Sequence, residues 1–211
     1  MSIDQLVAAC VAQIEASHGA REQAIGASRA LIRQCANSIR AAHRGEFSEA
    51  ERLVGEAGTT VALLASATAG RPDIRFAGYT QDALKEYAEA NLVLAFLAGR
   101  EPPAAAALGV ESAAYLNGLA EAASELRRAI LDGLRRGETA RGEALLQQMD
   151  DVYSALVTVD YPDAITGGLR RTTDALRAVL ERTRGDMTAA LRQDQLTSAM
   201  RELELRLGSN G

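Results

Sequence analysis

The sequence predicts an all-helical fold: a single-domain bundle of about six to seven antiparallel helices. Hydrophobic residues make up 47% of the 211 residues, but aromatic residues make up only 4% and Trp is absent. Many of the apolar residues are Ala and Leu, which favour helices over strands. They recur at spacings of three and four rather than in the alternation of a strand. A chain of this length can bury a core, so we expect one domain over residues 1–211.

Breaks in this pattern divide the chain into segments. The expected helices cover residues 2–43, 48–69, 76–97, 112–136, 138–157 and 166–207, with loops at 70–73 and 160–163, an Ala-rich connector at 104–110 and a frayed tail at 208–211. Gly45 and Gly137 stand where a helix end adopts left-handed backbone. Ser48 and Glu51 form a capping-box pattern, so a helix is expected to begin at Ser48. Gly185 marks a candidate interruption of the last helix.

One short motif occurs twice. Arg44-Gly45-Glu46 and Arg136-Gly137-Glu138 each join two expected helices. A helical solenoid would show at least three repeats at a short, regular period. The motif therefore indicates two helical hairpins, and the absence of a repeat array disfavours a helical-hairpin adaptor.

Charge and composition limit the possible partners. The net charge of -5 argues against a uniformly basic surface for nucleic acid, though not against a basic patch. No apolar run approaches the roughly 18 residues of a membrane span, and no signal segment opens the chain. We therefore expect no membrane association and a cytoplasmic location. Cys10 and Cys35 are expected to be small buried side chains, and His18 and His43 show no metal-ligand spacing.

The expected helix over residues 76–97 carries two acidic residues at helical spacing. Glu86 and Glu89 are three residues apart and share one face. Val93 and Phe96 continue the same stripe, and Asp82 precedes it by one turn. Because the continuation is apolar, this face is expected to point toward the protein interior.

A second acidic pair lies on the expected helix over residues 112–136. Glu121 and Glu125 are four residues apart, and small residues such as Gly118 and Ala122 beside them permit close approach of another helix. Either pair alone would more commonly belong to a solvent-exposed helix face. Our interpretation is that the two helices, antiparallel or crossing, direct all four carboxylates to one pocket that holds Mg²⁺ or Mn²⁺. Such a site activates water and stabilises charge on a phosphoryl group.

Two other kinds of all-helical protein also use clustered carboxylates. A ferritin-like di-iron bundle needs Glu-x-x-His motifs, and neither histidine has that setting. All-helical nucleoside triphosphate pyrophosphatases of the MazG type also use a Glu-x-x-Glu helix. Their second pair is Glu-x-x-Asp, whereas Glu121 and Glu125 have one more residue between them. The pyrophosphatase stays a weaker alternative. The sequence contains no Gly-rich phosphate loop and supports no Ser/His/Asp set.

Three segments resemble translin and its partner Trax. They are Ile39-Arg40-Ala41-Ala42-His43-Arg44-Gly45-Glu46-Phe47, Leu84-Lys85-Glu86-Tyr87-Ala88-Glu89-Ala90, and Tyr115-Leu116-Asn117-Gly118-Leu119-Ala120-Glu121 with Glu125-Leu126. The second segment is the most specific and is more similar to Trax. Residues 160–163 and 181–186 resemble archaeal and bacterial members. The resemblance extends from the first helix to about Thr188.

The resemblance implies a translin-like fold of about seven helices that assembles into hollow octamers, so we expect a homo-oligomer. Translin-type subunits bind single-stranded nucleic acid, and Trax-type subunits supply an Mg²⁺-dependent endoribonuclease site. The acidic residues of that site fall on Glu86, Glu89, Glu121 and Glu125, which we expect to be the catalytic metal ligands. Glu121 stands where Trax commonly has Asp.

The expected substrate is single-stranded RNA, with single-stranded DNA as a second possibility. Arg71, Arg75, Arg127 and Arg128 are the candidate nucleic-acid-binding residues, because guanidinium groups suit phosphate. Translin has an Arg/His-rich stretch before its acidic helix, whereas residues 73–79 here contain one Arg. The alternative function is a translin-like nucleic-acid-binding protein without catalytic activity.

Overall fold

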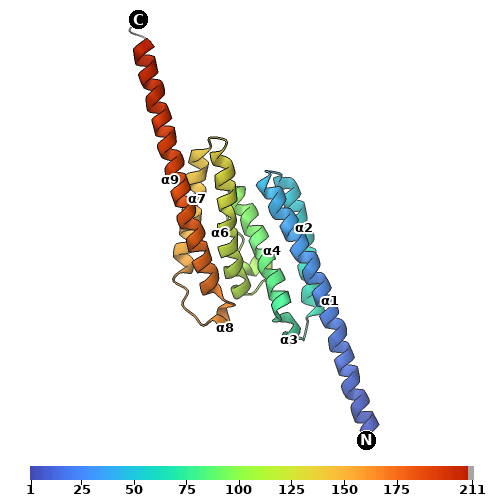
Figure 1. The fold of residues 1–211 in the computed structure, drawn as a ribbon. Helices are drawn as coiled ribbons and strands as arrows, with labels where there is room; N and C mark the ends of the chain where they lie inside the picture. Colours follow the sequence, from blue (N-terminus) through green and yellow to red (C-terminus); the bar gives the residue numbers. More distant parts are fainter. Residues whose placement is uncertain (209–211) are drawn as a thin grey trace.

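Two helical hairpins, each followed by one more long helix, make up the fold in the computed structural model, which describes residues 1–208 (Figure 1). The long helices are α1 (Ile3–His43), α2 (Phe47–Ala67), α4 (Gly78–Leu97), α6 (Ser112–Leu134), α7 (Thr139–Leu156) and α9 (Leu169–Gly208). The one-turn helices α3 (Pro72–Arg75), α5 (Ala105–Leu108) and α8 (Asp163–Thr166) lie in the connections. No strand occurs within residues 1–208. The all-helical prediction is confirmed.

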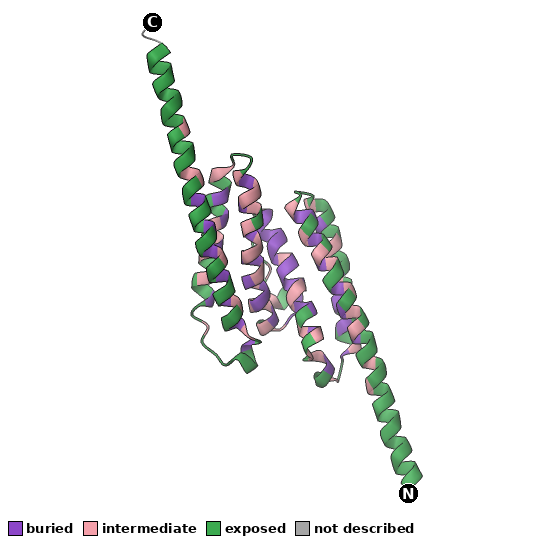
Figure 2. Ribbon diagram, in the orientation of Figure 1, coloured by how far each residue is buried: buried purple, intermediate pink, exposed green. Residues whose placement is uncertain are grey.

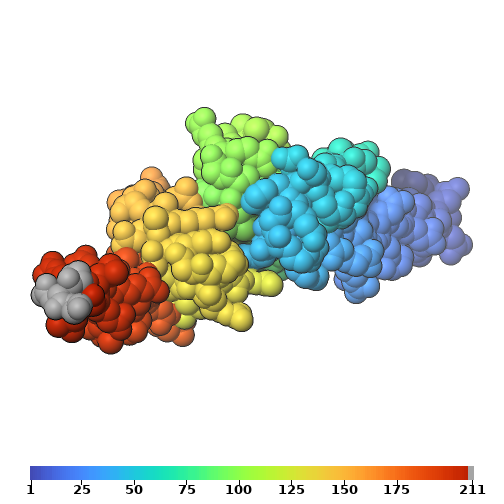
Figure 3. Space-filling model, turned by 90° about the horizontal axis from the view of Figure 1, so that it is seen from above, coloured from blue at the N-terminus to red at the C-terminus, as the bar shows by residue number. Residues whose placement is uncertain are grey.

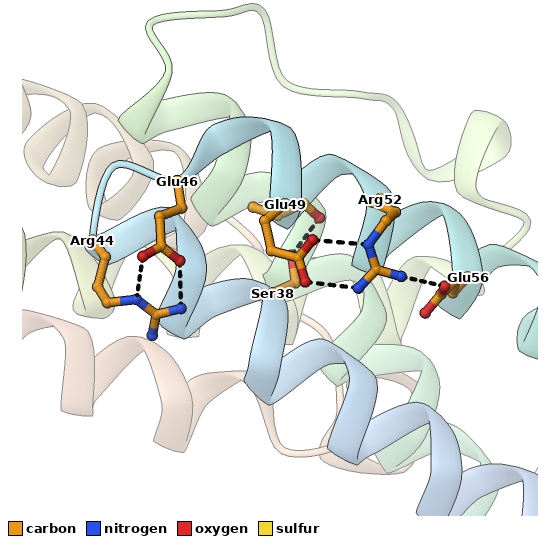
Figure 4. A network of polar contacts seen from close by, with 7 residues as sticks. Ser38, Arg44, Glu46, Glu49, Arg52 and Glu56 are labelled. Atoms are coloured by element: carbon orange, nitrogen blue, oxygen red, sulfur yellow. Dashed lines mark hydrogen bonds and ion pairs between the residues drawn. The ribbon is translucent and has the colours of Figure 1, made fainter.

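The two hairpin turns have the same construction. Gly45 and Gly137 adopt φ angles of 77° and 76°, a left-handed conformation that favours glycine. In the first turn, the Arg44 guanidinium donates two hydrogen bonds to Glu46, from Nε at 2.9 Å and from Nη2 at 2.6 Å (Figure 4). Arg136 and Glu138 repeat this pair in the second turn. The repeated motif therefore closes both hairpins, as predicted.

The capping box predicted at Ser48 is wrong. Helix α2 begins at Phe47, and its cap residue Glu46 makes no side-chain capping bond because Arg44 engages its carboxylate. A capping box is present at the start of α1 instead, where Ser2 and Gln5 bond each other's backbone N–H groups.

Helix α9 continues through Gly185 without the candidate interruption. A glycine in a helix costs only about 1 kcal/mol relative to alanine, which the rest of a long helix tolerates. Gly208 is the last residue of α9, and the remainder of the predicted tail lies outside the described residues.

Helix α4 is the most buried element and lies between the hairpins (Figure 2). It packs against α1, α2 and α6. In contrast to the expected antiparallel or crossing arrangement of the two acidic helices, α4 and α6 run in the same direction (Figure 1). The segment between them returns along the bundle before α6 begins. Arg75 just before α4 and Glu111 just before α6 accordingly form an ion pair of 2.6 Å, which places both helix starts at one end.

The two ends of the chain project from opposite ends of the bundle (Figures 1 and 2). Seen from above, the body is elongated, with the hairpins on either side of the end of α4 (Figure 3). The first half of α1 is largely exposed, so Cys10 is exposed and its predicted burial is wrong, whereas Cys35 is buried as expected. Within residues 1–208, no helix has the length and apolar character needed to cross a membrane.

Candidate functional site

Helices α4 and α6 bring three acidic side chains together. Glu86 and Glu89 of α4 and Glu121 of α6 each place one carboxylate oxygen within 4.8 Å of the others. Glu89 is 8% exposed, which is rare for a carboxylate without a partner. The two helices thus meet at their acidic faces, as the spacing in the sequence predicted for these three residues.

A glycine permits this close approach. A Cβ atom on Gly118 would lie 2.7 Å from the backbone oxygen of Lys85 and 3.1 Å from the backbone nitrogen of Glu89. These neighbours are helix backbone, which cannot move aside as a flexible side chain would. Gly118 therefore sets the separation of α4 and α6 at the level of the carboxylates.

Like charges shape the electrostatics of the cluster. Burial, followed by the negative charges of Glu86 and Glu121, raises the pKa of Glu89 to about 8. A divalent cation would remove this penalty, because it attracts all three carboxylates at once. The donor set and its charge therefore fit a hard metal ion that prefers oxygen ligands.

Lys85 neutralises part of this charge. Its Nζ atom lies 2.5 Å from Oε2 of Glu121 and 3.4 Å from Oε1 of Glu86. Burial opposes the charge on Lys85, but the hydrogen bond to Glu121 and the surrounding carboxylates outweigh it, so the pKa of Lys85 is raised. The only lysine of the chain therefore supplies a positive charge where the carboxylates meet.

The fourth predicted carboxylate has a different partner. Nε2 of His43, the last residue of α1, donates to Oε2 of Glu125 at 2.9 Å. This hydrogen bond lowers the pKa of Glu125, which keeps the carboxylate charged. The His43 side chain is only 2% exposed, and its Nδ1 has no hydrogen-bond partner among the described residues. Glu125 is close enough for its charge to raise the pKa of Glu89, but it lies outside the group of three.

Sequence reasoning missed His43. The residue has no metal-ligand spacing, and its partner lies 82 positions away. The sequence carries one indication of its role, because His43 stands two residues before Gly45, inside a segment that resembles the translin family.

Comparisons with known proteins identify solved structures that share the fold of this chain. The crystal structure of AfC3PO matches with 30% identity and a TM-score of 0.81, over 89% of this chain and 97% of that chain. The chain belongs to the translin family. A structure of AfC3PO with duplex RNA matches at the same identity and coverage with a TM-score of 0.79. Apo-NeC3PO, at 18% identity, shares the fold with a TM-score of 0.77 over 90% of this chain and 99% of that chain.

A relative is also found by sequence. An uncharacterized protein of Methanocaldococcus jannaschii is 28% identical over 189 residues, which cover 89% of this chain and 83% of that protein. No family model matches the sequence.

The four candidate arginines of this translin-family chain differ in their partners and exposure. Arg75 is 19% exposed and pairs with Glu111, and Arg127 lies 2.8 Å from Asp186. Arg71 donates to Ser17 on α1, and Arg128 is exposed on α6. Arg75 is therefore the least available for phosphate, and nucleic-acid contact by all four stays a prediction.

Proposed function

We propose that this protein binds RNA and cleaves it as an Mg²⁺-dependent endoribonuclease. The observation that carries the proposal is the convergence of Glu86, Glu89 and Glu121 within 4.8 Å, with Glu89 buried. The match to AfC3PO, of which a complex with duplex RNA is known, supports RNA as the substrate class. The structural matches above also favour this function over the pyrophosphatase.

Glu86, Glu89 and Glu121 would hold the metal, with Mn²⁺ as an alternative ion. Bound Mg²⁺ supplies activation of water and stabilisation of charge on the phosphoryl group. Glu125 keeps one oxygen that His43 does not engage, so it is available as a fourth ligand. His43 in this scheme orients Glu125 and keeps it charged.

The proposal includes a homo-oligomer, with an octamer as the expected state. The projecting part of α1 exposes apolar side chains on one face, including Ile3, Val7 and Ile14. The end of α9 exposes Leu196, Met200 and Leu203 at similar spacing. Isolated helical segments are marginally stable in water, so contact with other copies would both cover these faces and stabilise the projections.

The test is incubation of labelled single-stranded RNA with the protein and Mg²⁺, with and without EDTA. We expect cleavage that EDTA abolishes, and a loss of about a hundredfold or more in Glu89→Gln and Glu125→Gln with RNA binding retained. Glu51→Gln is the matched control, because Glu51 is exposed and pairs with Arg100 on the surface. Duplex RNA is tested as a second substrate under the same conditions.

Gln variants that cleave as well as the parent would refute the catalytic assignment. Binding without cleavage by the parent would instead indicate the second candidate function, a translin-like RNA-binding protein without activity.

A further inference from the structure

A groove extends from the carboxylate cluster toward the end of the bundle where α3 and α8 lie (Figure 1). It has a volume of about 450 Å³, and its lining includes Lys85 and Glu121 of the cluster. The same groove is lined by Phe76 after α3, Ile165 of α8 and Arg171 of α9. Ligand pockets start at roughly 300 Å³, so the groove has room for one nucleotide.

Phe76 and Ile165 give the groove two exposed apolar side chains. They are 63% and 67% exposed, although large apolar side chains usually gain free energy from burial. An aromatic ring beside a groove is a platform on which any nucleic-acid base can stack. Single exposed apolar residues are common on protein surfaces. Their frequency does not account for two such residues that line one groove next to the acidic cluster.

Arg171 adds a positive charge to the groove. It is exposed and has no ion-pair partner within residues 1–208, in contrast to Arg75 and Arg127. A guanidinium group presents a planar set of donors that fits phosphate. The exposed carboxylate of Asp82, also in the groove, can accept hydrogen bonds from a ribose hydroxyl or a base amino group.

The Arg171 side of the groove is held in place by Asn117 of α6. Asn117 Nδ2 donates to the backbone oxygen of Thr166 at 2.8 Å, and Asn117 Oδ1 accepts from Thr172 Oγ1 at 2.7 Å. Thr166 and Thr172 flank the turn into α9, so these bonds fasten the start of α9 to α6. A site fixed in this way loses little entropy when it binds.

We propose that this groove binds one unpaired nucleotide of the RNA next to the scissile phosphate, with its base against Phe76 and its phosphate on Arg171. The inference rests on the proposed function and adds to it a binding site for one nucleotide. A base that enters the groove has left its base pair. The groove therefore selects RNA with an unpaired nucleotide at the cleavage site.

The experiment measures binding of labelled single-stranded RNA, and of a duplex of the same sequence, by fluorescence anisotropy in EDTA. The full-length protein and its variants are compared after circular dichroism has shown equal helix content. Phe76→Ala should weaken single-strand binding about tenfold, whereas Phe76→Tyr, which keeps the ring, should bind like the parent. Arg171→Ala should weaken it several-fold, and both losses should be smaller for the duplex.

Arg170→Ala is the matched control, because the neighbouring guanidinium of Arg170 faces a different pocket beside Tyr161 and Asp174. The proposal is overturned if Phe76→Ala and Arg171→Ala bind single strands like the parent, if Phe76→Tyr loses as much as Phe76→Ala, or if Arg170→Ala loses as much as Arg171→Ala. If the parent cleaves RNA and these variants are unchanged, the groove assignment fails and the ribonuclease stands. If the parent binds no RNA, both fail.

Discussion

The ammonium group of Lys85 lies 2.5 Å from Oε2 of Glu121, across the contact between α4 and α6. The same group is 3.4 Å from Glu86, so an internal cation contacts two of the three carboxylates that would hold a metal ion. A metal ion held by these carboxylates would therefore compete with Lys85 for Glu86 and Glu121.

Replacement of Lys85 by Met should raise the affinity for Mn²⁺ or Mg²⁺ about tenfold, because the metal no longer displaces a charge-assisted hydrogen bond of about 1.5 kcal/mol. The metal-free protein should lose roughly 1–2 kcal/mol of stability, since the carboxylates then repel one another without compensation. Titration calorimetry and urea denaturation measure the two effects. Arg100→Met, which breaks the exposed pair with Glu51, is the control and should change neither. Unchanged or weaker metal binding by Lys85→Met would show that no competition exists.

The raised pKa of Glu89 predicts a pH dependence of stability in the absence of metal. With a folded pKa of about 8 against 4.5 in the unfolded chain, the folded state holds the proton more tightly. The stability that this provides is complete below pH 4.5 and is lost as the pH rises through 8. Urea denaturation in EDTA should show that the free energy of unfolding falls by a few kcal/mol between pH 5.5 and pH 8.5. The fall should be smaller in the Glu89→Gln variant. Equal slopes in the parent and the variant would contradict the assignment.

Gly118 and Gly185 should respond in opposite ways to replacement by Ala. Gly118→Ala places a Cβ atom 2.7 Å from a backbone oxygen of α4, which should cost about 1–3 kcal/mol and weaken metal binding by separating Glu121 from Glu89. Gly185→Ala meets nothing within 4 Å in a continuous helix and should stabilise by up to about 1 kcal/mol. Thermal denaturation with and without Mg²⁺ distinguishes them. A neutral Gly118→Ala would mean that the two helices are free to separate.

The exposed apolar face of α1 predicts the effect of charge on assembly. The parent should show a mass several times 22.3 kDa in light scattering. Val7→Lys with Ile14→Lys puts two charges on that face and should shift the mass toward 22.3 kDa. Ala12→Lys, on the opposite face of the same helix, is the control and should leave the assembly intact. A parent that is a monomer at micromolar concentration would overturn the proposed oligomer.

Several features of this protein follow from its sequence alone, because they depend on neighbours along the chain. The apolar spacing determines the six long helices, and Gly45 and Gly137 determine where two of them end. The spacing of Glu86 and Glu89 places both on one face of α4. The capping prediction at Ser48 failed because α2 begins at Phe47, so that Ser48 lies inside the helix and not at its cap.

The site itself required the tertiary structure. The parallel course of α4 and α6 brings together residues far apart in sequence. The hydrogen bond between His43 and Glu125 and the ion pair between Lys85 and Glu121 do the same. Helical periodicity tells which residues share a face, but the rotation and register of two packed helices decide which side chains meet. Gly118 depends on both the sequence and the tertiary structure. The sequence shows a small residue beside Glu121, but only the packing of Gly118 against the backbone of α4 explains why a side chain is excluded there. Without a side chain at this position, α4 and α6 approach closely enough to bring three carboxylates together.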